Sequence, residues 1–274
     1  MSILSLAMTR RWLGWLAFTT VFAVVCVLLA QWQWARRVEV VAQMRVVAEN
    51  WDAPAVALRD VLPAGGDLDP AREWSPVTLE GEYLTDDQVL VRNRPLNARP
   101  GFEVLTPLVL ETGEVFIVDR GWLPSGSAQD SPDTVPAPPE GRVEVVVRLK
   151  PGEPTIAGRG APEGQIATIH LPELAERIDV GPVITGAYGL LDSETPPVPE
   201  RPIAALRPVN DEGPHLSYTF QWYLFALLGF IGFGWALRHE HRVLRATETG
   251  EALPKPKRGI DAEVEDAILD ARER

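Results

Sequence analysis

The sequence has little of the chemistry on which most metal, redox and hydrolytic sites depend. It contains one cysteine, Cys26, three methionines and four histidines. It has no CxxC, HExxH or phosphate-binding glycine motif. Ser125 and Ser127 have no histidine near them in the sequence, and His170 stands alone in "TIHLPE". The scarcity of sulfur argues against a copper chaperone, because Cu(I) prefers Cys and Met ligands, and the lack of a catalytic triad argues against a hydrolase.

Two apolar runs are long enough to cross a bilayer. Residues 12–30 carry no charge, and residues 217–237 are almost entirely apolar or aromatic. Runs of roughly 20 residues span the ~30 Å hydrocarbon core as helices. The first run is longer than the core of a signal peptide, and Trp32 and Trp34 follow it where a cleavage site would stand. We therefore predict transmembrane helices over 12–32 and 217–237, with the first one uncleaved.

Two spans place both termini on one side of the membrane and residues 33–216 on the other. Five arginines near the span ends favour cytoplasmic segments 1–11 and 238–274, and three argue the other way. The five are Arg10, Arg11, Arg238, Arg242 and Arg245, and the three are Arg36, Arg37 and Arg45. We expect a protein of the bacterial plasma membrane, or of the equivalent inner membrane, with an exported middle region. Most of the net charge of −12 lies in 33–216, so nucleic acid is not an expected partner.

The exported region reads as a mainly antiparallel β domain with a short helix, which makes the fold class α+β. Residues 33–49 lack proline and glycine and predict a helical extension of the first span. Val-, Leu- and Thr-rich segments separated by turn residues predict strands over 75–83, 88–93, 102–110, 114–124, 142–150 and 182–192. "ETGE" at 111–114 predicts a hairpin, "LPELAERID" at 171–179 predicts a short helix, and 131–141 predicts a proline-rich surface loop.

Aromatic residues and glutamines gather where each span meets the exported side. Interfacial anchoring accounts for Trp32, Trp222 and Tyr223, because their rings are apolar at one end and polar at the other. It does not account for a glutamine beside a tryptophan in both helices, at Gln31 and Gln221. A glutamine in lipid needs a hydrogen-bonding partner, so we expect the two spans to contact each other there or to contact a third helix.

His215, Tyr218 and Trp222 stand at i, i+3 and i+7, on one face of the second helix. A neutral imidazole with aromatic neighbours at the membrane surface suits an axial haem ligand. The alternative role for His215 is to cap the helix or to hydrogen-bond the preceding loop.

Two further motifs have simpler interpretations. In "VDRGWLP" (118–124), Asp119 and Arg120 could form an ion pair, while Gly121 lets the chain turn under Trp122. In "RHEH" (238–241) the two histidines point apart on a helix, so this segment predicts a solvated juxtamembrane face.

Four stretches in order resemble the surfeit-locus family of cytochrome c oxidase assembly factors. They are "LLAQWQWARRVE", "RPGFEVLTPL" (99–108), "VFIVDRGWLP" (115–124) and "HLSYTFQWYLFAL", and the similarity extends between residues 13 and 237. The resemblance implies a protein that is not an enzyme and that assists insertion of haem A into the catalytic subunit of the oxidase. His215 matches the histidine that is proposed to bind haem in that family.

The expected site follows from the amphipathic nature of haem A. Its propionates would pair with Arg36, Arg37 and Arg207, and its ring and hydrocarbon tail would lie against Trp32, Tyr218, Trp222 and lipid. His215 would be the metal ligand. Besides the bilayer, the partners implied by the resemblance are the catalytic subunit and haem A synthase. The alternative is a scaffold or accessory subunit that binds no haem and docks on the oxidase through its two membrane helices.

Overall fold

A computed structural model describes residues 2–127, 131–209 and 211–250. The chain divides into two compact units, each described below by itself. The helical unit comprises 1–38 and 212–274, and the β domain comprises 39–211. The predicted charged tail at 238–274 is therefore described only as far as residue 250.

The helical unit consists of α1 (Ile3–Ala7), most of α2 (Arg10–Asn50) and α5 (His215–Thr249). α2 contains no proline along its 41 residues, and α5 begins directly after Pro214 and ends at Gly250, whose φ of 69° is left-handed. By length and composition, both α2 and α5 could cross a membrane. The fold is thus a mixed α+β one with two apolar helices, as expected from the sequence.

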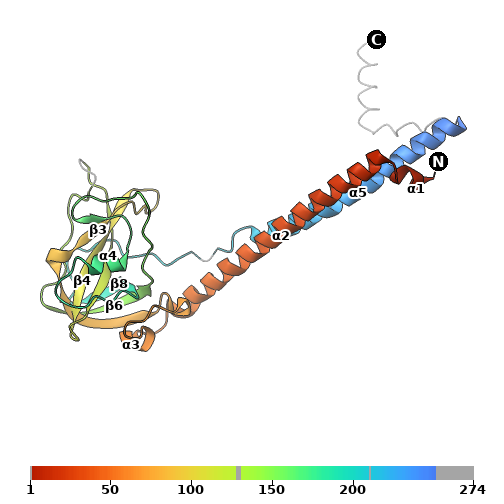
Figure 1. Ribbon diagram of the computed structural model, residues 1–274. Helices are drawn as coiled ribbons and strands as arrows, with labels where there is room; N and C mark the ends of the chain where they lie inside the picture. Colours follow the sequence, from red (N-terminus) through yellow and green to blue (C-terminus); the bar gives the residue numbers. More distant parts are fainter. Residues whose placement is uncertain (1, 128–130, 210, 251–274) are drawn as a thin grey trace, which may run out of the picture. The chain divides into compact units, whose positions relative to one another are not determined.

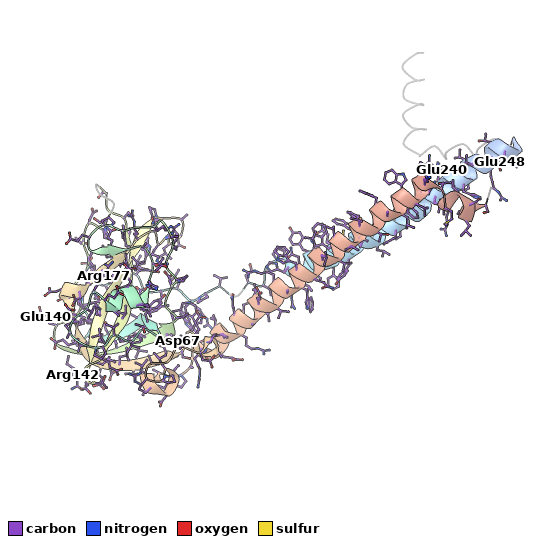
Figure 2. The ribbon with its side chains drawn as sticks, viewed as in Figure 1. Asp67, Glu140, Arg142, Arg177, Glu240 and Glu248 are labelled. Atoms are coloured by element: carbon purple, nitrogen blue, oxygen red, sulfur yellow. The ribbon has the colours of Figure 1, made fainter. Side chains whose placement is uncertain are left out.

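α2 and α5 run side by side in opposite directions (Figure 1). Near one end, Trp12 of α2 meets Phe233 of α5 with ring centroids 5.4 Å apart, and Glu240, labelled in Figure 2, pairs with an arginine of α2. Between the ends, the helices meet through small buried residues, namely Ala23, Cys26 and Ala226. Small side chains let helix backbones approach closely, and this geometry is common where helices associate in lipid.

Eight strands form the sheet of the β domain. They are β1 (Val56–Ala57), β2 (Pro76–Tyr83), β3 (Val89–Val91), β4 (Gly101–Leu110), β5 (Val115–Pro124), β6 (Arg142–Lys150), β7 (Gln165–Ile166) and β8 (Tyr188–Thr195). Their order is β1-β2-β6-β8-β5-β4-β3-β7, and β2 also pairs with β4. This extra pairing closes β2, β6, β8, β5 and β4 into a barrel-like ring, in which most neighbours are antiparallel and β5 and β8 are parallel.

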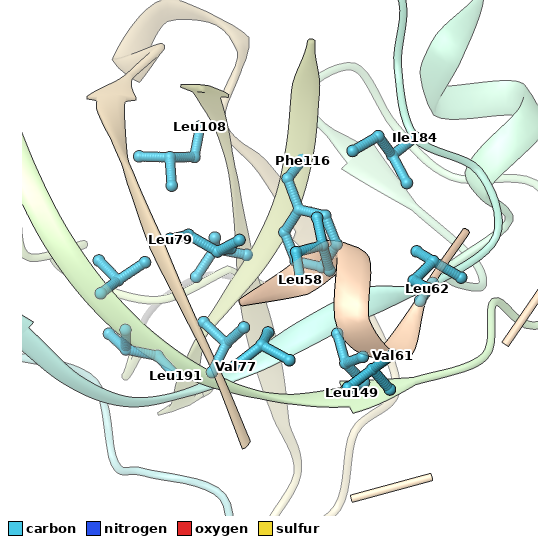
Figure 3. Close-up of a cluster of buried hydrophobic side chains, with 14 of the residues drawn as sticks. Leu58, Val61, Leu62, Val77, Leu79, Leu108, Phe116, Leu149, Ile184 and Leu191 are labelled. Carbon is cyan, nitrogen blue, oxygen red and sulfur yellow. The ribbon is translucent and has the colours of Figure 1, made fainter. Parts of the chain in front are cut away.

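The interior of the ring is filled by aliphatic side chains and two aromatic ones, Phe116 and Tyr83, and Figure 3 shows part of this cluster. Alternate residues of β6 point inward, which matches the period of two in its sequence. The short helix α3 (Leu58–Val61) contributes to the same core. The residues labelled in Figure 3 are Leu58, Val61, Leu62, Val77, Leu79, Leu108, Phe116, Leu149, Ile184 and Leu191.

β5 is buried on both faces, so it lies at the centre of the domain. Phe116 and Val118 point into the ring, whereas Val115 and Ile117 belong to a second cluster on the outer face. α4 (Leu171–Ala175) packs against this second cluster through Leu171.

The alternation of β5 corrects one expectation from the sequence. Asp119 and Arg120 do not pair, because neighbouring residues of a strand point to opposite faces. Arg120 pairs instead with Glu194, at 3.7 Å from Nη2 to Oε1, and donates to the carbonyl of Pro136 at 2.7 Å. Asp119 accepts from the backbone N–H of Gly121 at 2.9 Å.

The proline-rich segment 131–141 is a loop, as predicted, but part of it is buried. Pro132, Pro138 and Pro139 are buried, and the carbonyls of Pro136 and Ala137 accept hydrogen bonds from Arg120. The buried guanidinium needs acceptors, so it holds this segment against the barrel although the segment is poor in large apolar side chains.

Candidate functional site

A hydrogen bond joins the two long helices where α5 begins. Nδ1 of His215, the first residue of α5, lies 2.9 Å from Oε1 of Gln33 in α2. Both residues are half-buried. The contact lies just outside the ends of the predicted spans, which stop at residue 32 and start at residue 217. Next to it, Nε of Arg37 lies 2.8 Å from Oε2 of Glu212.

The contact with Gln33 engages one of the two ring nitrogens of His215. An amide oxygen only accepts hydrogen bonds, so in the tautomer that fits this contact Nδ1 of His215 donates to Gln33, and Nε2 lies on the other side of the ring. Gly213 adjoins this nitrogen, and a Cβ built on Gly213 would lie 3.5 Å from Nε2. The φ of Gly213, 66°, also favours glycine at this position. In proteins, a histidine that binds a metal through one ring nitrogen usually donates its other N–H to an oxygen in this way.

The aromatic residues predicted around His215 lie in different environments. Trp222 is half-buried and packs on the small-residue contact of α2 and α5, edge-on to Phe225 at 5.8 Å. Tyr218 and Trp32 are exposed, at 44% and 61%. Trp222 therefore lies on the same side of α5 as His215, while Tyr218 and Trp32 face outward, where lipid or a bound molecule would contact them.

The structure does not bring all of the basic residues predicted for the haem propionates to His215. Arg37 is in the helical unit, paired with Glu212, and its guanidinium lies 5.6 Å from the ring of Trp34. Arg36 is exposed in the same unit. Arg207 belongs to the β domain, where Nη1 lies 2.8 Å from Oδ2 of Asp52. The structure thus brings Arg37 to His215 with its charge already balanced, whereas Arg207 is part of the other unit.

Gln31 and Gln221 do not join the two helices to each other, and the other alternative, that they contact a third helix, stays a prediction. Gln31 and Gln221 are exposed, whereas Gln33 makes the interhelical contact. The spacing along α2 could have identified Gln33, because residues on the face toward α5 recur every three or four positions. This series consists of Thr19, Ala23, Cys26, Ala30, Gln33 and Arg37.

The histidines of "RHEH" lie near the other end of α5. The ring of His239 stacks on that of Trp235 with centroids 5.3 Å apart. Among the described residues, no group of three His, Cys, Asp or Glu side chains could hold a metal ion. Within the described part of the chain, a metal-containing group would therefore have at most two such protein ligands.

Comparisons with known proteins agree with this architecture. The model of the SURF1 family matches residues 20–227. Uncharacterized SURF1-like proteins of Mycobacterium bovis and Mycobacterium tuberculosis are each 31% identical over 262 residues, covering 92% of this chain and 94% of the relative. A SURF1-like protein of Caenorhabditis briggsae is 28% identical over 173 residues, covering 61% of this chain and 49% of the relative. The chain therefore belongs to the SURF1 family, a family of oxidase assembly factors.

Proposed function

We propose that this protein holds haem A at the membrane surface and assists its insertion into the catalytic subunit of cytochrome c oxidase. The observation that carries the proposal is the 2.9 Å contact between Gln33 Oε1 and His215 Nδ1. A histidine that binds a metal almost always donates its other ring N–H to an oxygen, which fixes the tautomer. Gln33 supplies that oxygen, so Nε2 of His215 is the ligand atom.

The surroundings of His215 suit an amphipathic cargo. Trp222 and the outward-facing Tyr218 offer aromatic surface on the membrane side. Arg37 lies on the polar side, where a propionate would compete with Glu212 for the guanidinium. The site would consequently bind haem through one iron ligand and an exchangeable ion pair, which suits a carrier that must release its cargo.

The same proposal includes an orientation in the membrane. Arg11 and Glu240 form an ion pair at the end of the helix pair opposite Gln33 and His215. The arginines that favour a cytoplasmic location cluster at that end, on both helices. We therefore place the termini in the cytoplasm, and His215 and the β domain on the exported side of a bacterial plasma membrane or an equivalent inner membrane.

Deletion of the protein tests this function in the cell. We expect an oxidase whose catalytic subunit is present but deficient in haem A, and we expect that added copper does not restore it. The full chain should restore haem A, whereas a His215→Ala variant should not. A deletion strain with a normal haem A content in its oxidase would contradict the proposal.

A second candidate function has its own observation. Gln31 and Gln221 are exposed near the ends of the predicted spans, and a glutamine facing lipid gains by bonding to a partner helix. This favours a docking role, in which the protein contacts the oxidase without binding haem. Gln31→Leu combined with Gln221→Leu should then reduce co-purification with the oxidase, by about 0.6 kcal/mol for each lost hydrogen bond. Gln33→Leu, which alters the interhelical contact, serves as the matched comparison.

A further inference from the structure

The β domain contains a cavity of about 410 Å³ that includes none of the residues of the candidate site around His215. Parts of "RPGFEV" and "VDRGWLP", two of the four stretches that carried the family resemblance, line it. Trp122 forms one wall, and its Nε1 donates to the carbonyl of Arg94 at 2.6 Å, which fixes the ring. The polar lining consists of Asn93, Arg94, Glu103, Asp119, Lys150 and Tyr188.

Asp119 is the unusual member of this lining. Asp119 is only 3% exposed, and one of its carboxylate oxygens accepts a hydrogen bond from the backbone N–H of Gly121 at 2.9 Å. Within the described part of the chain, the other oxygen accepts no hydrogen bond, and the carboxylate forms no ion pair. Burial of a carboxylate without a partner is costly, so this oxygen at the cavity wall needs a donor that the domain itself does not supply.

The cations in the cavity are already used by other carboxylates. Nε of Arg94 lies 2.9 Å from Oε2 of Glu103, and its Nη2 donates to Glu153. Lys150 pairs with Glu73, and its Nζ lies 4.1 Å from the ring centroid of Trp74. The carboxylate of Asp119 is therefore the excess negative charge of the lining. Burial raises the pKa of Asp119, and the nearby charge of Glu103 raises it further, so both disfavour the ionised carboxylate unless a cation lies beside it.

We propose that this cavity binds an organic monocation, an alkyl ammonium or guanidinium group, with Asp119 as its counter-ion. Tyr188 offers a hydroxyl that, among the described residues, makes no hydrogen bond and can accept one from the same cation. Trp122 and Leu190 provide an aromatic and apolar wall for the alkyl part. A divalent metal is a poorer occupant, because no set of three suitable ligands exists among the described residues.

Two sources could supply such a group: a free amine, or a basic side chain of a partner protein. Ile203 and Leu206 line the cavity and are 50% and 59% exposed. Exposed aliphatic residues around a buried charge resemble a protein interface, in which an arginine or lysine enters a pocket surrounded by apolar contacts. The proposal is independent of haem binding, since it rests on residues of the β domain alone.

Calorimetric titration of the detergent-solubilised full chain tests the proposal. The probes are n-butylguanidinium and n-butylurea, which have similar shapes but differ in charge. We expect saturable binding of the guanidinium, and an affinity for the urea that is lower by about tenfold or more, since hydrogen bonds to charged groups are the stronger ones. A capped Gly-Arg-Gly peptide should bind more tightly than n-butylguanidinium if the source is a protein, and equally if it is a free amine.

Variants assign the binding to Asp119. Asp119→Asn keeps an acceptor for Gly121 and should lower the affinity for n-butylguanidinium about tenfold. Asp179→Asn removes the same charge from an exposed position and should leave binding unchanged. Tyr188→Phe is a second variant at the cavity and should also weaken binding, and resistance to proteolysis checks that each variant is folded. Equal affinity of Asp119→Asn and the unaltered chain, or no saturable binding of either cationic probe, would overturn the proposal.

Discussion

Gln33 Oε1 lies 2.9 Å from Nδ1 of His215, so a side chain of α2 orients an imidazole of α5. Replacement of Gln33 by leucine removes the acceptor and leaves the ring free to rotate. Because partners of this kind contribute about 10–100-fold to metal affinity, Gln33→Leu should weaken haem binding by a similar factor. Haem titration of the purified chain measures the change. Gln31→Leu, two positions away and exposed, is the control, and equal losses in both variants would argue against the orienting role.

The orientation in the membrane can be tested with reporters that are active only outside the cytoplasm. Residues 154–164 form an exposed segment of the β domain, and a Cβ added at Gly160 would meet no other atom within 4 Å, so an insertion after this residue has open space around it. A reporter inserted there should be active, whereas one fused to the C-terminus should be silent. The opposite pattern would contradict the exported location of the β domain.

Breaking the buried pair of Arg120 and Glu194 should destabilise the barrel strongly. Arg120→Met leaves the buried carboxylate of Glu194 without a cation, although Tyr83 still donates to it, which should lower the free energy of unfolding by about 3–5 kcal/mol. A double variant with Glu194→Leu should recover most of this loss, since two apolar residues leave no unpaired charge. Urea unfolding of the full chain, monitored by its susceptibility to proteolysis, compares the free energies of unfolding of the single variant, the double variant and the unaltered chain.

Arg177→Met is the matched control for the Arg120 variant. Arg177 pairs with Glu173 across one helical turn, and both side chains are nearly half exposed. Its replacement should change the stability by no more than about 0.5 kcal/mol. Similar decreases in the free energy of unfolding for the Arg120 and Arg177 variants would show that the buried pair contributes no more to stability than an exposed pair.

Asp119 should make the stability of the β domain depend on pH. Burial raises its pKa in the folded chain above the value of about 3.9 in the unfolded chain. The stability that protonation supplies is complete below the unfolded pKa and is lost as pH rises through the folded pKa. Asp119→Asn abolishes this titration, so the variant does not lose this stability. The free energy of unfolding of the variant, relative to that of the unaltered chain, should therefore increase as pH rises above about 4, by at most ~1.4 kcal/mol per pH unit. A difference that stays constant from pH 5 to 8 would contradict this.

Much of the fold was predictable because its signals are local. The strands around 76–83, 101–110, 115–124 and 142–150, and the hairpin at 111–114, follow from alternating side chains and turn residues. The strand expected over 182–192 lies at 188–195 instead. Its first residues make only a bridge, through Val183 with Val115, before the chain joins the sheet.

The remaining features depend on contacts between distant parts of the chain. The pairing of β2 with β4, which closes the ring, and the parallel pairing of β5 with β8 have no local signature. The same reason applies to the site. The choice of Gln33 over Gln31 depends on which face of α2 meets α5, and the excess charge of Asp119 becomes visible only when Arg94 and Lys150 are seen paired with other carboxylates.

The most direct test of haem binding is the absorption spectrum of the full chain purified in detergent from cells that synthesise haem A. The unaltered chain should carry a haem A spectrum, and His215→Ala should remove or shift it while membrane insertion is retained. His239→Ala alters a histidine of the same helix that stacks on Trp235, and it should leave the spectrum unchanged. An unaltered haem spectrum in His215→Ala, together with full restoration of the oxidase in the deletion strain, would contradict the assignment of His215 as the ligand.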